Sequence, residues 1–208
     1  MTFFTIQPGQ LTLDDIESCF RSDTNFTLSD DCHSQISAAQ ATVQKIVDQD
    51  TTVYGINTGF GLLAQKRIPH DELKHLQVNL VLSHAAGTGP LLDDDIVRLI
   101  MLLKINSLAR GYSGVRPVVI EYLLKMLNGG ILPRVPAQGS VGASGDLAPL
   151  AHLSCALIGV GEVSLNGDSV AAADGLRHLG LQPLTLDPKE GLALLNGTQV
   201  STALALQG

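Results

Sequence analysis

The chain has 208 residues, of which 45% are hydrophobic, enough for one substantial core or two small ones. Its formal charge of −7 argues against nucleic acid or an anionic membrane as the main partner. The first residues lack a signal-peptide pattern and no apolar stretch reaches transmembrane length, so we expect a soluble, cytoplasmic protein.

Helical signals occupy most of the first 130 residues. Thr12 and Asp15 have the spacing of a capping box, which predicts a helix that begins directly after Thr12. Apolar residues at helical spacing predict four further helices. The first covers about 29–47, the second starts near Pro69 and carries His84, the third follows Asp93, and the fourth begins at Pro117.

The remaining residues mix extended and helical signals. Two prolines hold 133–136 extended, and a helix follows over 147–158. Residues 163–170 resemble a hairpin with Asn166-Gly167 in its turn, followed by a short helix over 171–179. An apolar helical pattern then runs from Leu192 to Leu206. Together the patterns predict a mainly α protein with minor β.

Composition adds two expectations. Only 16% of the residues are charged and the mean hydropathy is +0.23, which suggests that subunits bury part of the surface between them. Cys19, Cys32 and Cys155 are odd in number and lack metal-type spacing, so we expect reduced structural thiols.

The segment Gly142-Ala143-Ser144-Gly145-Asp146 is the most informative part of the chain. One interpretation is the start of a helix, with Asp146 as N-cap and Pro149 in the first turn. Proline is tolerated there because amides of the first turn have no partner within the helix. A phosphate cradle is the other common use of a glycine-rich turn. This run, however, lacks the lysine of a P-loop and the G-x-G-x-x-G spacing.

The same tripeptide also has the composition for an internal cyclisation. Small Ala143 and side-chain-free Gly145 allow the sharp bend that brings the Gly145 nitrogen to the Ala143 carbonyl carbon. Loss of water closes a five-membered ring, and loss of the Ser144 hydroxyl as a second water leaves an exocyclic methylidene. The product is a methylidene-imidazolone, an electrophile that ordinary side chains do not provide. A helix that begins here is compatible with this ring, because a helix N-terminus favours negative charge that builds up on the ring.

Four stretches of the chain together resemble the aromatic amino-acid ammonia-lyases, which build this prosthetic group from Ala-Ser-Gly. The stretches occur in the order typical of that family and span nearly the whole chain: Tyr54 to Gly61, Asn79 to His84, Gly139 to Leu150, and Lys189 to Thr198. The resemblance implies the N-terminal domain of the aspartase/fumarase-like helical fold. It also implies 5-methylidene-imidazol-4-one as the cofactor, made autocatalytically, with no metal or nucleotide.

The pair Ser83-His84 is similar to the histidine-specific members of the family, whereas phenylalanine and tyrosine enzymes place Phe-Leu or His-Leu there. The resemblance therefore implies L-histidine as substrate and trans-urocanate and ammonia as products, the first step of histidine breakdown. A phenylalanine or tyrosine ammonia-lyase, or an aminomutase, is the alternative. A third hypothesis is a non-catalytic fragment that only associates with full-length subunits.

The resemblance also assigns roles to single residues. Tyr54 matches the tyrosine that removes the β-proton, a weak base unless positive potential lowers its pKa, since a free phenol titrates near ~10. His84 matches the residue thought to bind the substrate imidazole. Asn196 matches an asparagine near the prosthetic group, and Asp146 could assist ring formation, cap the helix, or both. Without the resemblance, Tyr54 would be a strand tyrosine, His84 a core histidine, and Asn196 part of an Asn-Gly turn. Arg116 also matches an arginine of the family, and the sequence indicates for it only pairing within a loop or at an interface.

Family members are longer and assemble as homotetramers with further active-site residues downstream. We therefore expect residues 1–195 to form an N-terminal domain and 196–208 to start a central helical bundle. The 208 residues alone are expected to be inactive, since part of each site lies in that bundle.

Overall fold

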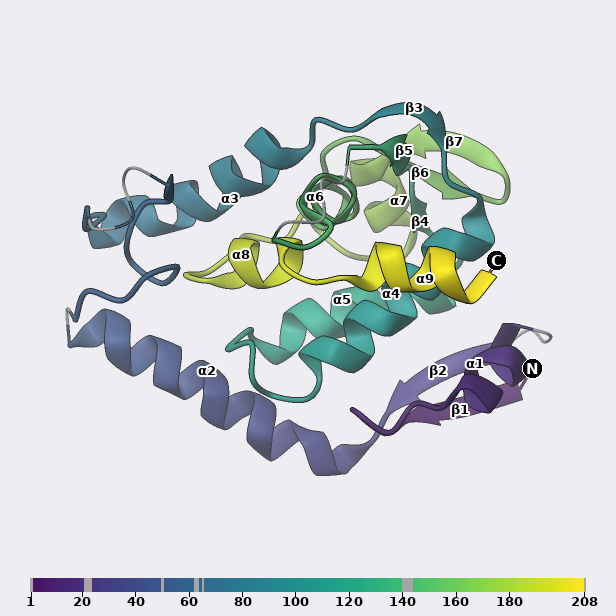
Figure 1. Cartoon of the computed structure of the whole chain (residues 1–208), viewed down its shortest axis with the longest axis horizontal. Helices are drawn as coiled ribbons and strands as arrows, with labels where there is room; N and C mark the ends of the chain where they lie inside the picture. Colours follow the sequence, from purple (N-terminus) through teal and green to yellow (C-terminus); the bar gives the residue numbers. More distant parts are fainter. Residues whose placement is uncertain are drawn as a thin grey trace.

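The structure, a computed structural model, describes residues 2–20, 24–49, 51–61, 64, 66–139 and 144–207, except for the side chains of Cys19 and Phe20. The described chain is mainly helical with short strands, as predicted (Figure 1). None of the helices in these ranges is both long and apolar enough to cross a membrane.

The N-terminal region is a small β-α-β unit. Strand β1 (Thr2–Ile6) pairs in parallel with β2 (Thr24–Leu28), and α1 (Leu13–Phe20) lies between them in sequence. The predicted capping box is confirmed: the Thr12 amide donates to Asp15 Oδ2 at 2.9 Å, and the Asp15 amide donates to Thr12 Oγ1 at 3.2 Å. The strands were not predicted, because two five-residue strands leave little periodicity to detect.

The predicted helices of the first 130 residues are present. A 3₁₀ turn, η1 (Asp30–Cys32), leads into α2 (His33–Asp48), and η3 (His70–Glu72) leads into α3 (Leu73–His84). Helix α4 (Asp94–Leu108) follows, with nine buried residues. Helix α5 (Pro117–Asn128) has the proline in its first turn.

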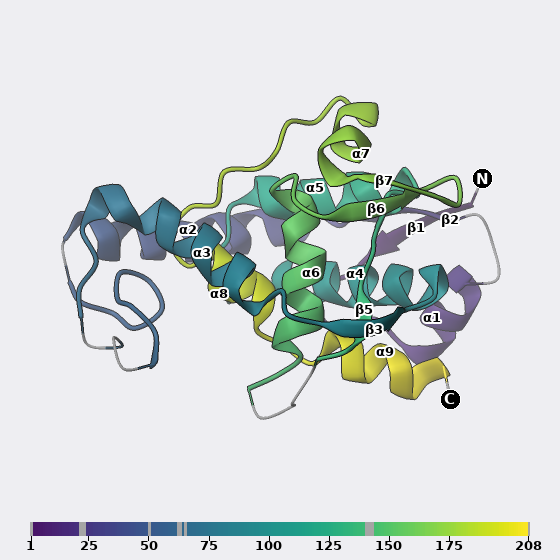
Figure 2. The same ribbon diagram turned by 90° about the horizontal axis from the view of Figure 1, so that it is seen from above.

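Helix α6 (Leu147–Leu157) lies in the middle of the molecule (Figure 2). Eight of its eleven residues are buried, because α3 and α8 (Glu190–Leu195) pack against it. This burial on nearly all sides explains its almost wholly apolar sequence. The residues directly before α6 include Ser144 and Gly145 of the tripeptide for which the sequence predicts cyclisation.

Two small antiparallel sheets flank α6. Strand β3 (Thr88–Leu91) pairs with β5 (Pro136–Gln138), and β4 (Leu132–Pro133) pairs with β6 (Glu162–Leu165), which pairs with β7 (Asp168–Ala171). The predicted β6–β7 hairpin is confirmed, with Asn166 and Gly167 at positive φ in the turn. Helix α7 (Ala172–His178) follows, close to the predicted range.

The apolar pattern from Leu192 to Leu206 divides into two helices. Helix α8 ends at Leu195, and α9 (Gln199–Gln207) begins after a short break at 196–198. Helix α9 packs along α4, as the ribbon shows (Figure 1). The break brings the backbone of Asn196 and Gly197 next to the segment that precedes α6.

Candidate functional site

The turn before α6 is built around Gly145. Its φ is +104°, a value that L side chains rarely adopt. A Cβ at this position would lie 2.5 Å from the carbonyl oxygen of Gly197, so only glycine fits. The next amide, of Asp146, donates to that same oxygen at 2.8 Å. Ser144 is exposed, while Gly145 and Asp146 are buried. Ala143, the predicted first residue of the tripeptide, lies outside the described residues.

Asp146 precedes α6, as predicted, but its carboxylate makes no capping bond to that helix. It accepts hydrogen bonds from the backbone amide of Ser201, at 2.8 Å, and from the Ser201 hydroxyl. Ser201 is the third residue of α9, so the buried carboxylate stabilises the start of α9 instead. The structure thus shows this side chain bonded to α9 where the sequence predicted a cap of α6.

Asn196 directly follows α8 and joins the same cluster. Its side-chain amide donates to the Ser144 carbonyl oxygen at 3.4 Å, a long hydrogen bond between residues 52 positions apart. Its own carbonyl oxygen accepts from Lys104 Nζ at 2.8 Å. The fold thus brings together Ser144, Gly145, Asp146 and Asn196, four residues that the sequence placed in two separate motifs.

Lys104 was not among the predicted site residues. It lies on α4, is 1% exposed, and burial lowers its pKa to about 7 from a usual 10.5. The sequence did contain a signal, because Lys104 is four residues after Ile100 and eight after Ile96, two apolar residues at helical spacing in the predicted helix after Asp93. A lysine at that spacing in an apolar stripe points into the core.

His84 is the last residue of α3 and is half-buried. Its Nδ1 lies 2.8 Å from the Leu80 carbonyl oxygen and 3.2 Å from Ser83 Oγ. A carbonyl oxygen only accepts, so Nδ1 carries a hydrogen and Nε2 is the acceptor of the neutral ring. Three residues on, the Gly87 amide donates to Nε2 of His152 on α6 at 3.0 Å, which ties this end of α3 to α6.

Tyr54 lies on the loop that follows α2. Its side chain is 59% exposed and packs edge-on against Phe60, with ring centroids 5.9 Å apart. The neighbouring Gly55 lies against Leu192 of α8, since a Cβ there would be 2.5 Å from Leu192 Cδ2. The loop is therefore beside the helix that leads to Asn196. Within the described residues, no hydrogen bond or ring contact joins Tyr54 to Ser144 or Asn196.

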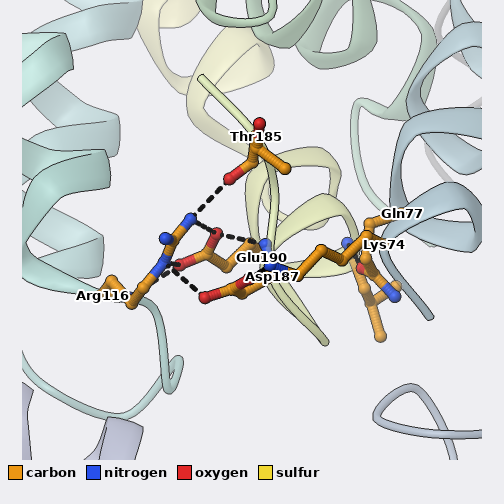
Figure 3. A network of polar contacts seen from close by, with 7 residues as sticks. Lys74, Gln77, Arg116, Thr185, Asp187 and Glu190 are labelled. Atoms are coloured by element: carbon orange, nitrogen blue, oxygen red, sulfur yellow. Dashed lines mark hydrogen bonds and ion pairs between the residues drawn. The ribbon is translucent and has the colours of Figure 1, made fainter. Parts of the chain in front are cut away.

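A charged network anchors the other end of α8 (Figure 3). Glu190, 1% exposed, accepts from the Arg116 guanidinium at 2.8 and 2.9 Å and from the Arg116 backbone amide. Asp187 pairs with Arg116 at 3.0 Å and with Lys74 of α3 at 3.1 Å, and Thr185 supplies a carbonyl to Arg116. Hydrogen bonding to Glu190 raises the pKa of Arg116. Arg116, for which the sequence indicated only loop or interface pairing, holds α8 in place.

Comparisons with known proteins agree with this arrangement. Residues 11–208 match the sequence model of the family described as aromatic amino acid lyase. The chain is 56% identical over 205 residues to histidine ammonia-lyase of Pseudoalteromonas atlantica, with 99% of this chain and 40% of that protein covered. The chain therefore belongs to the aromatic amino acid lyase family, as the motifs predicted, and spans about 40% of the length of this relative.

Solved structures show the same fold. Histidine ammonia-lyase from Trypanosoma cruzi superposes with a TM-score of 0.90 at 39% identity, over 100% of this chain and 40% of that one. The ergothioneine-degrading enzyme ergothionase from Treponema denticola, solved with desmethyl-ergothioneine sulfonic acid, superposes with a TM-score of 0.94 at 29% identity, over 99% and 41%. The predicted fold class, the helical fold of these lyases, is confirmed.

Proposed function

We propose that this chain is the N-terminal part of a histidine ammonia-lyase, which converts L-histidine to trans-urocanate and ammonia without oxidation. The observation that carries the proposal is the contact between two motifs: Gly145, in a backbone conformation and space that only glycine fits, lies against Gly197, and Asn196 reaches Ser144. The family match and 56% identity to a histidine ammonia-lyase support it.

We propose that Ala143, Ser144 and Gly145 form the methylidene-imidazolone, with Asp146 assisting. The described residues fit such a group. A cyclised Gly145 nitrogen needs a bent backbone without a Cβ, and Gly145 has φ +104° and no room for a side chain. Once formed, the ring supplies an electrophile that activates the departure of ammonia. The start of α6, whose first amides have no partners within the helix, adds positive potential there.

His84 and Tyr54 would act on the substrate itself. His84 Nε2, the acceptor of the neutral ring, suits the N–H of a substrate imidazole. Tyr54, exposed on a loop beside α8, would accept the β-proton after the loop closes over the substrate. Asn196 would donate to the prosthetic group or the substrate from the position where its amide now meets Ser144.

The division of the chain is also part of the proposal. Residues 1–195 would be the N-terminal domain and 196–208, which include α9, the start of the central helical bundle. The complete protein would be a cytoplasmic homotetramer in which several subunits contribute to each site. The 208 residues alone would then be inactive, because each site is incomplete.

A phenylalanine or tyrosine ammonia-lyase, or an aminomutase, is the second candidate. Structures of such enzymes superpose well, among them a phenylalanine aminomutase from Pantoea agglomerans at 31% identity. Ser83-His84 and the higher identity to histidine ammonia-lyases favour histidine. His84→Phe separates the candidates: we expect it to lower turnover of histidine relative to phenylalanine, whereas an enzyme of the second class would keep its preference.

The decisive experiment completes the chain with the downstream part of the Pseudoalteromonas atlantica relative and follows urocanate by its absorbance. Intact mass should show the loss of two waters, located to residues 143–145 by peptide mapping. Ser144→Ala should abolish both the mass loss and turnover, while Ser169→Ala, on exposed β7, should leave both unchanged. Undiminished turnover of histidine by Ser144→Ala would refute the proposed function. Turnover by the 208-residue chain alone would refute the proposal that its site is incomplete. A lack of turnover when this chain is mixed with the separate downstream part would favour a non-catalytic fragment.

A further inference from the structure

Lys104 is one of the largest side chains that the described structure buries completely. Its hydrogen bond goes to the carbonyl oxygen of Asn196, at 2.8 Å, and it forms no ion pair within the described residues. An ammonium group taken out of water loses its hydration, and a single hydrogen bond to a carbonyl oxygen offsets that loss only in part. The fold therefore accommodates an energetically costly residue behind the proposed site.

The hydrogen bond from Lys104 holds the segment directly after α8, and a second hydrogen bond holds the same segment. Asn196 offers its carbonyl to Lys104, and the following carbonyl, of Gly197, accepts from the Asp146 amide at 2.8 Å. Two successive peptide groups after α8 are thus attached to α4 on one side and to the turn before α6 on the other. The side-chain amide of Asn196, between these attachments, meets the Ser144 carbonyl.

A purely structural role does not require a lysine at this position. The other buried residues of α4 are all apolar, and a methionine has nearly the same length as Lys104 and no charge to desolvate. Replacement by methionine would leave the Asn196 carbonyl oxygen without its donor, which destabilises the fold. It would also remove the desolvation of an ammonium, so the two effects on stability oppose each other.

We propose that Lys104 is a positioning residue for the reaction: by fixing the Asn196 carbonyl it sets where the Asn196 amide meets the Ser144–Gly145 turn, and so controls ring formation and turnover. This inference rests on the proposed function. It adds a residue from outside the four family-like stretches, on a helix that carries none of the proposed site residues.

The test compares Lys104→Met with Leu102→Met in the chain completed as above. Leu102 is on the same helix and 1% exposed, and exchange of leucine for methionine keeps the volume. We expect Lys104→Met to slow the loss of two waters and to lower kcat by roughly 10- to 100-fold with little change in KM, since small misplacements have such effects. Hydrogen exchange at the Asp146 amide should also accelerate. Leu102→Met should change none of these.

Each outcome decides the matter. If Lys104→Met dehydrates and turns over histidine like Leu102→Met, Lys104 has no positioning role. If Lys104→Met fails to fold where Leu102→Met folds, Lys104 is structural and the inference is wrong. If the completed chain with Lys104 intact neither dehydrates nor makes urocanate, the proposed function fails and this inference with it.

Discussion

A fully buried ionisable side chain lies at each end of α8, and the two side chains have very different hydrogen-bond partners. At the first end, Glu190 accepts from the Arg116 guanidinium and from backbone amides of Arg116 and Asp187. At the last end, Lys104 donates to a single acceptor among the described residues, the carbonyl oxygen of Asn196. Both side chains are 1% exposed, so the difference lies in their partners and not in their access to water.

The comparison separates a buried charge that is stabilised by its partners from a buried charge whose desolvation is largely uncompensated. Pairing with Glu190 raises the pKa of Arg116, so these contacts favour the charged guanidinium. Burial lowers the pKa of Lys104 to about 7, so its surroundings disfavour the charged form. The paired end anchors α8 to α3 and α5, and the unpaired end lies against the residue that we place in the active site. The predictions below test this division from the largest expected effect to the smallest.

Glu190→Ala should have the largest effect on stability. It would leave the Arg116 guanidinium without its buried partner and remove the acceptor for two backbone amides, so we expect a loss of about 3–5 kcal/mol in the free energy of unfolding. Denaturant unfolding of the 208-residue chain would measure it. Glu121→Ala, exposed on α5, is the control and should change little. Equal effects of the two variants would show that the network does not anchor α8.

The stability of the chain should rise between pH 7 and pH 9. In this window an unfolded Lys104, with a pKa of 10.5, keeps its proton while the folded one, with a pKa of about 7, has lost it. The unfolded state then binds more protons, so the free energy of unfolding increases with pH, by up to about 1.4 kcal/mol per pH unit. Denaturant unfolding at several pH values should show this rise, and Lys104→Met should flatten it.

Two other groups limit the window of that experiment. The pKa of Lys189 is also lowered by burial, which leaves a rise of the same sign in Lys104→Met. Burial raises the pKa of Cys155 to about 11, so above pH 9 the unfolded thiol ionises first and opposes the rise from Lys104. A slope between pH 7 and pH 9 that is identical in Lys104→Met and the unsubstituted chain would contradict the assignment to Lys104.

Gly145→Ala should lower the free energy of unfolding by about 1–3 kcal/mol and separate the turn from Gly197. Gly161→Ala is a matched control, because Gly161 also has positive φ, +82°, but a Cβ there would meet open space. The difference between the two variants in denaturant unfolding reports chiefly the close approach of the Gly197 backbone. Equal losses would mean that backbone strain, and not close approach, accounts for the glycine.

Lys74→Met should have the smallest effect. Its pair with Asp187 is more open to water, with the Lys74 side chain 59% exposed, so we expect at most about 1 kcal/mol. Salt should reduce that small contribution further, which unfolding at two ionic strengths would test. A loss as large as that of Glu190→Ala would place the anchor of α8 at its surface rather than at the buried pair.

Local patterns predicted most of the helices, because their signals lie within a few residues. The Thr12–Asp15 box, Pro117 at a first turn and Asn166-Gly167 in a hairpin all depend on neighbours in sequence. The parallel pairing of β1 with β2 was missed, since its register joins residues 22 apart. Asp146 was predicted to precede a helix and does, but its carboxylate serves α9, a partner 55 residues away.

The candidate site shows the same limit. The composition of Ala143-Ser144-Gly145 indicated the cyclisation by itself, whereas His84, Tyr54 and Asn196 were singled out only by the resemblance of their stretches to the family. Folding of distant segments was needed to bring Asn196 to Ser144, to keep Tyr54 exposed beside α8, and to bury Lys104 behind Asn196. Proximity and desolvation depend on contacts between residues that are far apart along the chain, and no local spacing encodes them.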